Sequence, residues 1–249
     1  MIQTLATATM KNLYIGVMSG TSVDAIDIVA VEIFDDSIYF YDAFSFTFET
    51  TLRKEILELS RNSLELSNSE LKLIDKKLAH AYGKAINEFI YISKVNKNDI
   101  VAVGLHGQTI FHQPDAEHPF SLQIGDGQIV SDITKLTIID DFRSADIKAG
   151  GQGAPLAPIF HSFLFGHKEE VRCVVNLGGI ANITLVISKN NEDLKSFDVG
   201  PGNCLMDEWV RRHTKKKYDK NGEAAKTGKT SQVILNQAID NFDNISNLK

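Results

Sequence analysis

The stretch LYIGVMSGTSVDAIDIVAVEIF, residues 13–34, places a polar segment between two apolar runs. The runs 13–18 and 26–34 are rich in Ile and Val, which predicts two β-strands. The segment between them, residues 19–25, holds hydroxyl, carboxylate and glycine residues, more than a tight turn between strands needs. An ordinary turn built from Ser, Gly and Asp fits this composition, and so does a loop that binds phosphate groups.

The composition of the whole chain is that of a globular protein with one large or two small domains. It has 249 residues, 43% of them hydrophobic, and a net charge of −6. The longest basic run is Lys215–Lys217, which argues against a nucleic-acid-binding protein. The two cysteines, Cys173 and Cys204, are too few for a disulfide scaffold and lack zinc-site spacing. Without a signal peptide or a long apolar segment, we expect a cytoplasmic protein that binds no membrane.

Strands and helices alternate in the first part of the chain. Further strands are predicted at residues 38–48, 99–107 and 134–142, and a short helix at residues 51–59. Ser67 and Glu70 have the spacing of a capping box that opens a longer helix. Pro155, in a glycine-rich turn, suits the first turn of another helix.

A second strand–turn–strand unit begins at residue 171 and repeats the layout of the first. A strand, a glycine turn and a second strand are predicted within residues 171–188, and a third strand that ends at a turn within residues 195–203, followed by helices at residues 204–213 and 231–249. The repeat predicts an α/β fold of two duplicated lobes around a cleft, residues 1–146 and 147–249. The second lobe is too short to cover its own sheet edge and helix face, so we expect it to be incomplete.

A set of motifs in a fixed order carries a resemblance to a known family. They are YIGVMSGTSVDAIDIV, GLHGQTIFHQP, LQIGDG, DFRSADIKAGGQGAPLAPIFH, NLGGIANIT and FDVGPGNCLMD. From Leu13 to about Gly228 the chain resembles anhydro-N-acetylmuramic acid kinase, a family of the sugar kinase and actin superfamily. The resemblance implies actin-like ATPase lobes of the ribonuclease H-like type and a possible homodimer. Members of the family continue beyond this chain's end with a further Gly-rich nucleotide segment and a substrate-contacting acid.

The resemblance also implies an unusual reaction in peptidoglycan recycling. ATP and water act together on 1,6-anhydro-N-acetylmuramic acid. Water opens the anhydro bridge at the anomeric carbon and O6 takes the γ-phosphoryl group, which gives N-acetylmuramic acid 6-phosphate. Mg²⁺ is implied by the nucleotide. Two alternatives stay open: an inactive remnant that still binds sugar or nucleotide, and a fragment that needs a missing C-terminal piece.

The opening loop is the first candidate ATP site. Its candidate ATP-binding residues are Gly20, Thr21, Ser22, Asp24 and Asp27. Gly20 would let backbone N–H groups approach phosphate oxygens, and the neighbouring hydroxyls would add donors. Asp24 or Asp27 could hold Mg²⁺, which prefers oxygen ligands. The family usually has Gly where Ala25 stands.

The turn NLGGIAN, residues 176–182, is the second candidate ATP site. Its candidate residues, with one glycine further along the chain, are Gly178, Gly179, Asn182 and Gly200. Paired glycines permit a close approach of phosphate, but they are also common in tight β-hairpins.

Asp198, in FDVGPGN, matches the catalytic base of the family. It is predicted to follow a strand and would take a proton from the attacking water. The alternative is a structural role, in which Asp198 caps the helix that begins near Asn203.

The candidate sugar-binding residues are Ser19, His106, Gln108, Arg143, Gly151 and Gln152. Arg143 can bind a carboxylate in bidentate geometry, and the lactyl group of the muramic acid carries one. Asp141 or Asp146 could instead hold Arg143 in a structural ion pair. His106 and Gln108 flank a glycine at a strand end, where they could line a sugar pocket.

The remaining histidines do not predict a metal site. His112 and His118 follow His106 at intervals of six residues, a spacing that does not gather ligands on one helix face. We expect them, like Trp209, to serve packing.

Overall fold

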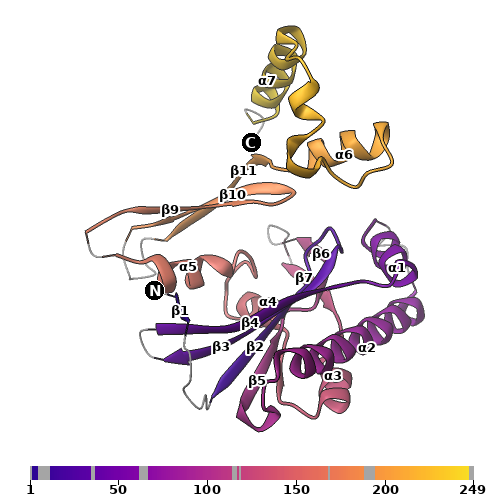
Figure 1. Cartoon of the computed structure of the whole chain (residues 1–249), viewed down its shortest axis with the longest axis vertical. Helices are drawn as coiled ribbons and strands as arrows, with labels where there is room; N and C mark the ends of the chain where they lie inside the picture. The colour runs from indigo at the N-terminus through magenta and orange to yellow at the C-terminus, as the bar shows by residue number, and fades with distance from the viewer. Residues whose placement is uncertain are drawn as a thin grey trace. The chain divides into compact units, whose positions relative to one another are not determined.

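The computed structural model describes residues 2–4, 12–34, 37–61, 67–113, 117, 119–167, 169–187 and 194–246. The chain has a mixed α/β fold that divides into two compact units (Figure 1). Unit 1 comprises residues 1–174 and 184–196, and unit 2 comprises residues 175–183 and 197–249. The boundary expected after residue 146 falls inside unit 1, so the division into lobes 1–146 and 147–249 stays a prediction.

Unit 1 is built on a six-stranded sheet. Its order is β1 (Ile2–Thr4), β4 (Ser37–Thr47), β3 (Ala25–Phe34), β2 (Leu13–Met18), β5 (Ile100–Leu105) and β8 (Ile138–Ile139). β2 and β3 are antiparallel, with Met18 opposite Asp27, and β5 runs parallel to β2. The predicted strands are confirmed except at 134–142, where Thr134 ends a helix and only Ile138 and Ile139 pair.

The hydrophobic core of unit 1 lies between the sheet and the helices α1 (Thr50–Arg61) and α2 (Asn68–Ser93) (Figure 1). Alternate residues of β2 and β3, such as Ile15 and Ile28, pack in one cluster with Ile86 and Phe89 of α2. The capping box at the start of α2 is confirmed: Ser67 Oγ accepts from Glu70 N–H, and the Glu70 carboxylate accepts from Ser67 N–H.

Shorter elements complete unit 1. They are the hairpin β6 (Gln108–Gln113) and β7 (Phe120–Ile124), and the helices α3 (Gly127–Thr134), α4 (Phe142–Lys148) and α5 (Ala157–Phe165). The expectation for Pro155 was wrong, because it precedes α5 and Pro158 occupies the first turn. His118 lies outside the described residues.

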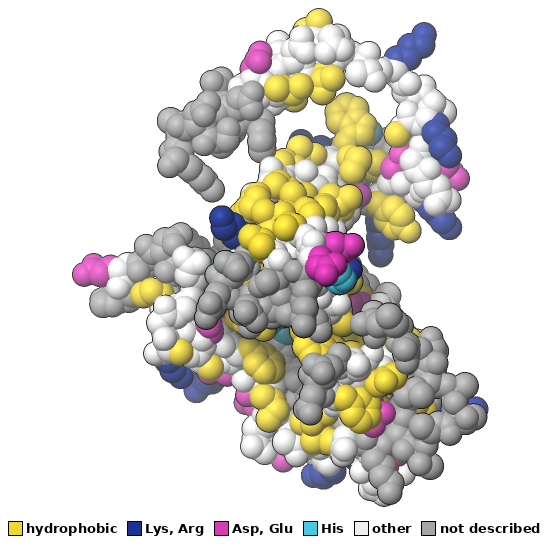
Figure 2. Space-filling model, turned by 90° about the vertical axis from the view of Figure 1, so that its left-hand side faces the viewer, with side chains coloured by type: hydrophobic (Ala, Val, Ile, Leu, Met, Phe, Trp, Pro, Cys, Tyr) yellow, Lys and Arg dark blue, Asp and Glu magenta, His cyan; other side chains and the backbone are white. Residues whose placement is uncertain are grey.

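The second half of the chain holds the sheet β11 (Lys195–Pro201), β10 (Ile180–Val186) and β9 (Arg172–Leu177), in that order, and the helices α6 (Cys204–His213) and α7 (Gln232–Ser246). These elements confirm the predicted pattern. Figure 2 shows hydrophobic side chains gathered on the surface in the upper half of the view.

Unit 2 buries few apolar side chains. Of its described residues, only Ala181 and Val210 are buried hydrophobics. Its large hydrophobic side chains are exposed, among them Leu177, Ile180, Phe197, Leu205, Met206 and Trp209. Unit 2 therefore has little hydrophobic core of its own.

No helix in the described ranges has both the length and the apolar character to cross a bilayer.

Candidate active site

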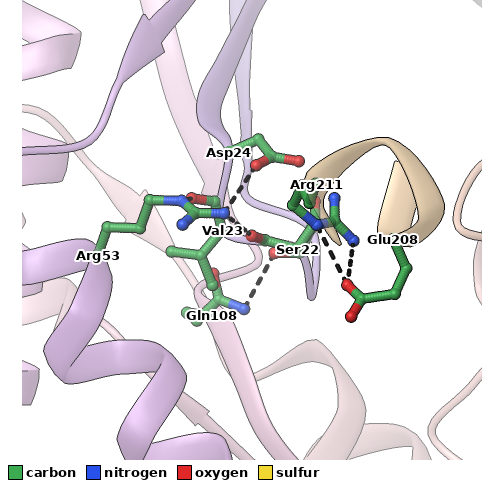
Figure 3. A network of polar contacts seen from close by, with 8 residues as sticks. Ser22, Val23, Asp24, Arg53, Gln108, Glu208 and Arg211 are labelled. Carbon is green, nitrogen blue, oxygen red and sulfur yellow. Dashed lines mark hydrogen bonds and ion pairs between the residues drawn. The ribbon is translucent and has the colours of Figure 1, made fainter. Parts of the chain in front are cut away.

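The loop of residues 19–24, between β2 and β3, is held from outside by Arg53 of α1 (Figure 3). Arg53 Nε donates to the carbonyl of Val23 over 2.8 Å, and Nη2 donates to the carbonyl of Ser22 over 3.0 Å. Nη2 also pairs with Asp24 Oδ1 at 2.9 Å. This role of Arg53 could not be predicted from the sequence, because no local pattern identifies the partner of an arginine on a surface helix.

Val23 has an unusual backbone within this loop. Its φ is +52°, a left-handed value that β-branched residues rarely adopt, and its side chain is fully buried. The conformation is therefore imposed by tertiary contacts, namely the buried side chain and the Arg53 hydrogen bond. Backbone strain of this kind is concentrated at functional sites.

A buried network supports the same loop from within unit 1. Gln108 Nε2 donates to the carbonyl of Gly20 over 3.1 Å (Figure 3), and Ser19 Oγ donates to Gln108 Oε1 over 2.9 Å. Because the Ser19 proton is used there, the Tyr82 hydroxyl is the donor in its 2.5 Å bond with Ser19 Oγ. Burial raises the pKa of Tyr82, so this hydroxyl keeps its proton.

Ser19 and Gln108 are thus buried partners of the loop, 1% and 0% exposed. Their predicted contact with a sugar stays a prediction. Tyr82 was not singled out from the sequence, since it occupies a core position of α2 like its apolar neighbours.

The outer face of the loop is polar. Thr21, Ser22 and Asp24 of the loop are exposed, and so is Asp27 of the adjoining β3, which accepts from the Ser45 hydroxyl. A Cβ added at Gly20 would meet nothing closer than Ser22 Oγ at 3.9 Å, and the φ of Gly20 is not positive. The fold therefore does not require glycine at position 20, whereas close approach of a ligand would.

The loop offers hard oxygen donors that fit Mg²⁺ bound together with phosphate oxygens. No group of three or more metal-ligating His, Cys, Asp or Glu side chains occurs in the part of the chain that the structure describes. Asp24 forms an ion pair with Arg53, whereas Asp27 accepts a hydrogen bond from the Ser45 hydroxyl. Of the two predicted carboxylates, Asp27 is therefore the more available to a metal ion.

Arg143, near the start of α4, is paired with His106, which follows β5. Arg143 Nε donates to His106 Nε2 over 3.0 Å, and His106 Nδ1 lies 2.9 Å from the carbonyl oxygen of Gly107. Burial lowers the pKa of His106, with a smaller contribution in the same direction from the Arg143 charge. The alternative ion pair with Asp141 or Asp146 is not formed among the described residues.

A cavity of about 570 Å³ adjoins this pair. Its lining includes Met18, Asp27, Ser45, His106 and Phe142. One carboxylate predicted for ATP and one imidazole predicted for the sugar thus share a cavity within unit 1.

The other two predicted sugar residues lie after α4. A Cβ added at Gly151 would lie 2.1 Å from Asp146 Oδ2, so glycine is required there for packing. Asp146 Oδ2 also accepts from Gly153 N–H at 2.7 Å. Gln152 is exposed.

In unit 2, Gly178 and Gly179 form the turn between β9 and β10. Their carbonyls accept from Asn203 N–H at 2.8 Å and Gly202 N–H at 2.9 Å, which ties the turn to the start of α6. Neither glycine has a positive φ, and an added Cβ would meet only ordinary contacts of 3.6 Å or more. The tight β-hairpin of the structural alternative is therefore present, but neither a positive φ nor crowding explains why both of its turn residues are glycines.

The other predicted residues of unit 2 lie on strands. Asn182 is half-buried on β10, and Gly200, on β11, has a φ of +141°. The conformation of Gly200 is reason enough for a glycine there.

Asp198 lies inside β11 rather than after its end, which corrects the expected placement. Its carboxylate is exposed and has no hydrogen bond or ion pair with any described residue. Asn203, the N-cap of α6, has no side-chain capping bond. The capping alternative for Asp198 was therefore wrong.

Solved structures give only weak likenesses. An exopolyphosphatase-like protein matches with a TM-score of 0.38 and 14% identity over 93% of this chain and 59% of that chain. The PPX-GPPA enzyme of Aquifex aeolicus matches with a TM-score of 0.37 and 12% identity over 80% and 55%. Likenesses at this level carry no argument.

The sequence comparisons are much stronger. Anhydro-N-acetylmuramic acid kinase of Pelagibacter ubique is 50% identical over 251 residues, which covers 96% of this chain and 65% of the relative. The enzyme of the same name from Photobacterium profundum is 38% identical over 91% of this chain and 60% of the relative. The chain thus spans 60–65% of the length of these curated relatives. The family model of anhydro-N-acetylmuramic acid kinase matches residues 12–243, and the chain belongs to this family.

Proposed function

We propose that the chain takes part in the ATP-dependent opening and phosphorylation of 1,6-anhydro-N-acetylmuramic acid in peptidoglycan recycling. The observation that carries this proposal is the exposed carboxylate of Asp198, which has no partner among the described residues and lies within the family-matching region. Asp198 takes a proton from water as the water oxygen bonds to the anomeric carbon and the bond from that carbon to O6 breaks. The bound nucleotide supplies the phosphoryl group that O6 receives.

The sugar is assigned to residues of unit 1. Arg143 keeps its two terminal nitrogens free of protein partners within the described ranges, and a carboxylate can accept two hydrogen bonds from such a face. Ser19, His106, Gln108, Gly151 and Gln152 are proposed around it. Ser19 and Gln108, being buried, would act by holding the opening loop.

ATP phosphates are assigned to the two glycine-containing turns. Gly20, Gly178 and Gly179 lack a conformational need for glycine, so a close ligand approach explains them. Thr21, Ser22 and Asn182 would add donors, Gly200 would shape the strand, and Asp24 or Asp27 would hold Mg²⁺. We propose that the turns belong to two duplicated actin-like lobes around a cleft. A homodimer in the cytoplasm is expected from the resemblance.

A second candidate function is sugar or nucleotide binding without turnover. It is favoured by the scarcity of buried apolar side chains among the described residues of unit 2. In that case a further polypeptide would be needed for catalysis.

Incubation of the chain with the anhydro sugar and ATP, followed by mass spectrometry, tests the proposal. Wild-type protein is expected to form a sugar phosphate that has gained one water. Asp198→Asn should reduce the rate about a hundred- to ten-thousand-fold. Asp240→Asn, at an exposed aspartate of α7, is the matched control and should leave the rate unchanged. A folded wild-type chain that binds the sugar but forms no product would favour the second function.

A further inference from the structure

Arg143 is held through a single atom. Its Nε donates to His106 Nε2 over 3.0 Å, and no other side-chain nitrogen of Arg143 bonds to a described residue. A guanidinium has five N–H donors in a planar fork, so fixing Nε fixes the direction of the terminal nitrogens as well. His106 itself is fixed by its 2.9 Å contact with the carbonyl oxygen of Gly107.

We propose that His106 is a positioning residue that, as a neutral imidazole, orients Arg143 so that its terminal nitrogens receive the carboxylate of the sugar. The inference rests on the proposed function, because it assumes that Arg143 meets this carboxylate. It replaces direct sugar contact as the role of His106. It also predicts that carboxylate recognition depends on the protonation state of a second residue.

The hydrogen bonds require one tautomer of His106. Arginine has only donors, so Nε2 must be the acceptor and the proton must lie on Nδ1, which donates to the Gly107 carbonyl. A second proton, on Nε2, would point at the guanidinium, and the resulting imidazolium would place two positive charges side by side. Burial, the largest cause, and the Arg143 charge lower the pKa of His106, while the hydrogen bond to the Gly107 carbonyl raises it. The net shift is downward and favours the accepting form at neutral pH.

Other charged groups surround the ring. Asp27 of β3 shares the 570 Å³ cavity with His106. A second cavity of about 240 Å³ is lined by Asp75 of α2 and by three further carboxylates, those of Asp126, Asp140 and Asp141. Arg143 and the Gly107 carbonyl alone bond the ring among the described residues. Since the carboxylates also bear charge, the contribution of His106 must be isolated with variants of His106.

Two substitutions separate hydrogen bonding from titration. The amide oxygen of His106→Gln can accept from Arg143 Nε but does not titrate, whereas His106→Leu fills the space without an acceptor. His161→Gln is the matched control, because His161 is half-buried, also has a pKa lowered by burial, and bonds to Thr184 instead of an arginine.

Calorimetric titration with the anhydro sugar between about pH 5 and pH 8 is the test. Wild-type affinity is expected to fall as the pH drops below 6.5, the ordinary pKa of histidine, and His161→Gln should behave the same way. His106→Gln should bind at pH 8 about as tightly as wild type and lose this dependence. His106→Leu should bind about tenfold more weakly throughout. If turnover is measurable, the loss should appear in KM rather than kcat. Wild-type binding by His106→Leu, or a pH dependence retained by His106→Gln, would overturn the proposal.

Nitrogen-15 NMR of the His106 ring tests the positioning without any sugar. The Nδ1–H tautomer is expected, and Arg143→Gln should raise the pKa of His106 because it removes a neighbouring positive charge. If the wild-type chain binds no sugar at any pH, the proposed function fails. The NMR result would still test the hydrogen bond from Arg143 to His106, and an Nε2–H tautomer would contradict that bond.

Discussion

Arg53 Nε lies 2.8 Å from the carbonyl oxygen of Val23, a residue held in the left-handed region of backbone conformation. The two residues are 30 positions apart, so helix α1 holds the loop between β2 and β3 in a shape that its own sequence disfavours. The same guanidinium bonds the Ser22 carbonyl and the Asp24 carboxylate. The contacts of Arg53 therefore hold the proposed phosphate loop in this shape.

Removing this arginine should loosen the loop. Arg53→Ala is expected to lower the free energy of unfolding by about 1 kcal/mol, a modest value because the side chain is 40% exposed, and to weaken ATP binding. Urea unfolding and calorimetry with ATP measure the two effects. Lys54→Ala, at the next and exposed position of α1, should change neither. Undiminished ATP binding by Arg53→Ala would show that the loop does not need this contact.

The Tyr82 hydroxyl should contribute through its bond to Ser19. Tyr82→Phe removes one buried hydrogen bond and is expected to cost about 1 kcal/mol of unfolding free energy. Tyr91→Phe, in the same helix but 85% exposed, is the control and should be neutral. Equal stability of the two variants in urea would mean that the buried network does not stabilise the fold.

A substitution at Gly20 tests whether glycine is needed at this position for the fold or for ligand binding. Because an added Cβ has open space, Gly20→Ala should keep wild-type stability while weakening ATP binding by about tenfold or more, through a methyl group facing the phosphates. Gly228→Ala, where the added Cβ also meets only ordinary contacts, serves as the control for both measurements. Wild-type ATP affinity of Gly20→Ala would remove this glycine from the phosphate site.

Stability should fall when the pH drops below 6.5. Burial lowers the pKa of His106 and of His161 from the ordinary value of 6.5, so the unfolded chain binds more protons than the folded one below that pH. Their contribution is complete above pH 6.5 and is lost as the pH falls toward the folded-state pKa values. Urea unfolding of wild type and of the double variant His106→Gln and His161→Gln measures it. The difference in unfolding free energy between the two proteins should shrink or reverse toward low pH. A difference that stays constant with pH would contradict the lowered pKa values of His106 and His161.

The sequence predicted those parts of the fold that have a strong local pattern. Strands 13–18 and 26–34 and the capping box of Ser67 and Glu70 are confirmed. Helices α3 and α4 were missed because they have only 8 and 7 residues, too few for a clear apolar period. The strand predicted at 134–142 was reduced to two residues, since Thr134 belongs to α3 and Lys135 ends it in a left-handed conformation.

The candidate site was predictable where motifs mark it and not where distant residues meet. The motifs singled out Gly20, Arg143 and Asp198, but not what each one contacts. Arg53 and Tyr82 act on the loop from helices far along the chain, and no spacing rule links them to it. The pairing of Arg143 with His106, rather than with a nearby aspartate, likewise depends on how α4 packs beside the end of β5.

We propose that this chain couples the attack of water to phosphoryl transfer, with Asp198 as the base. The most direct measurement is the reaction in oxygen-18 water, with mass spectrometry of the sugar product and unlabelled product in labelled water as the exchange control. We expect wild-type protein to form a sugar phosphate that carries one labelled oxygen at the anomeric carbon. We expect Asp198→Asn not to form this labelled product. Release of inorganic phosphate from ATP with the anhydro sugar left intact would contradict it.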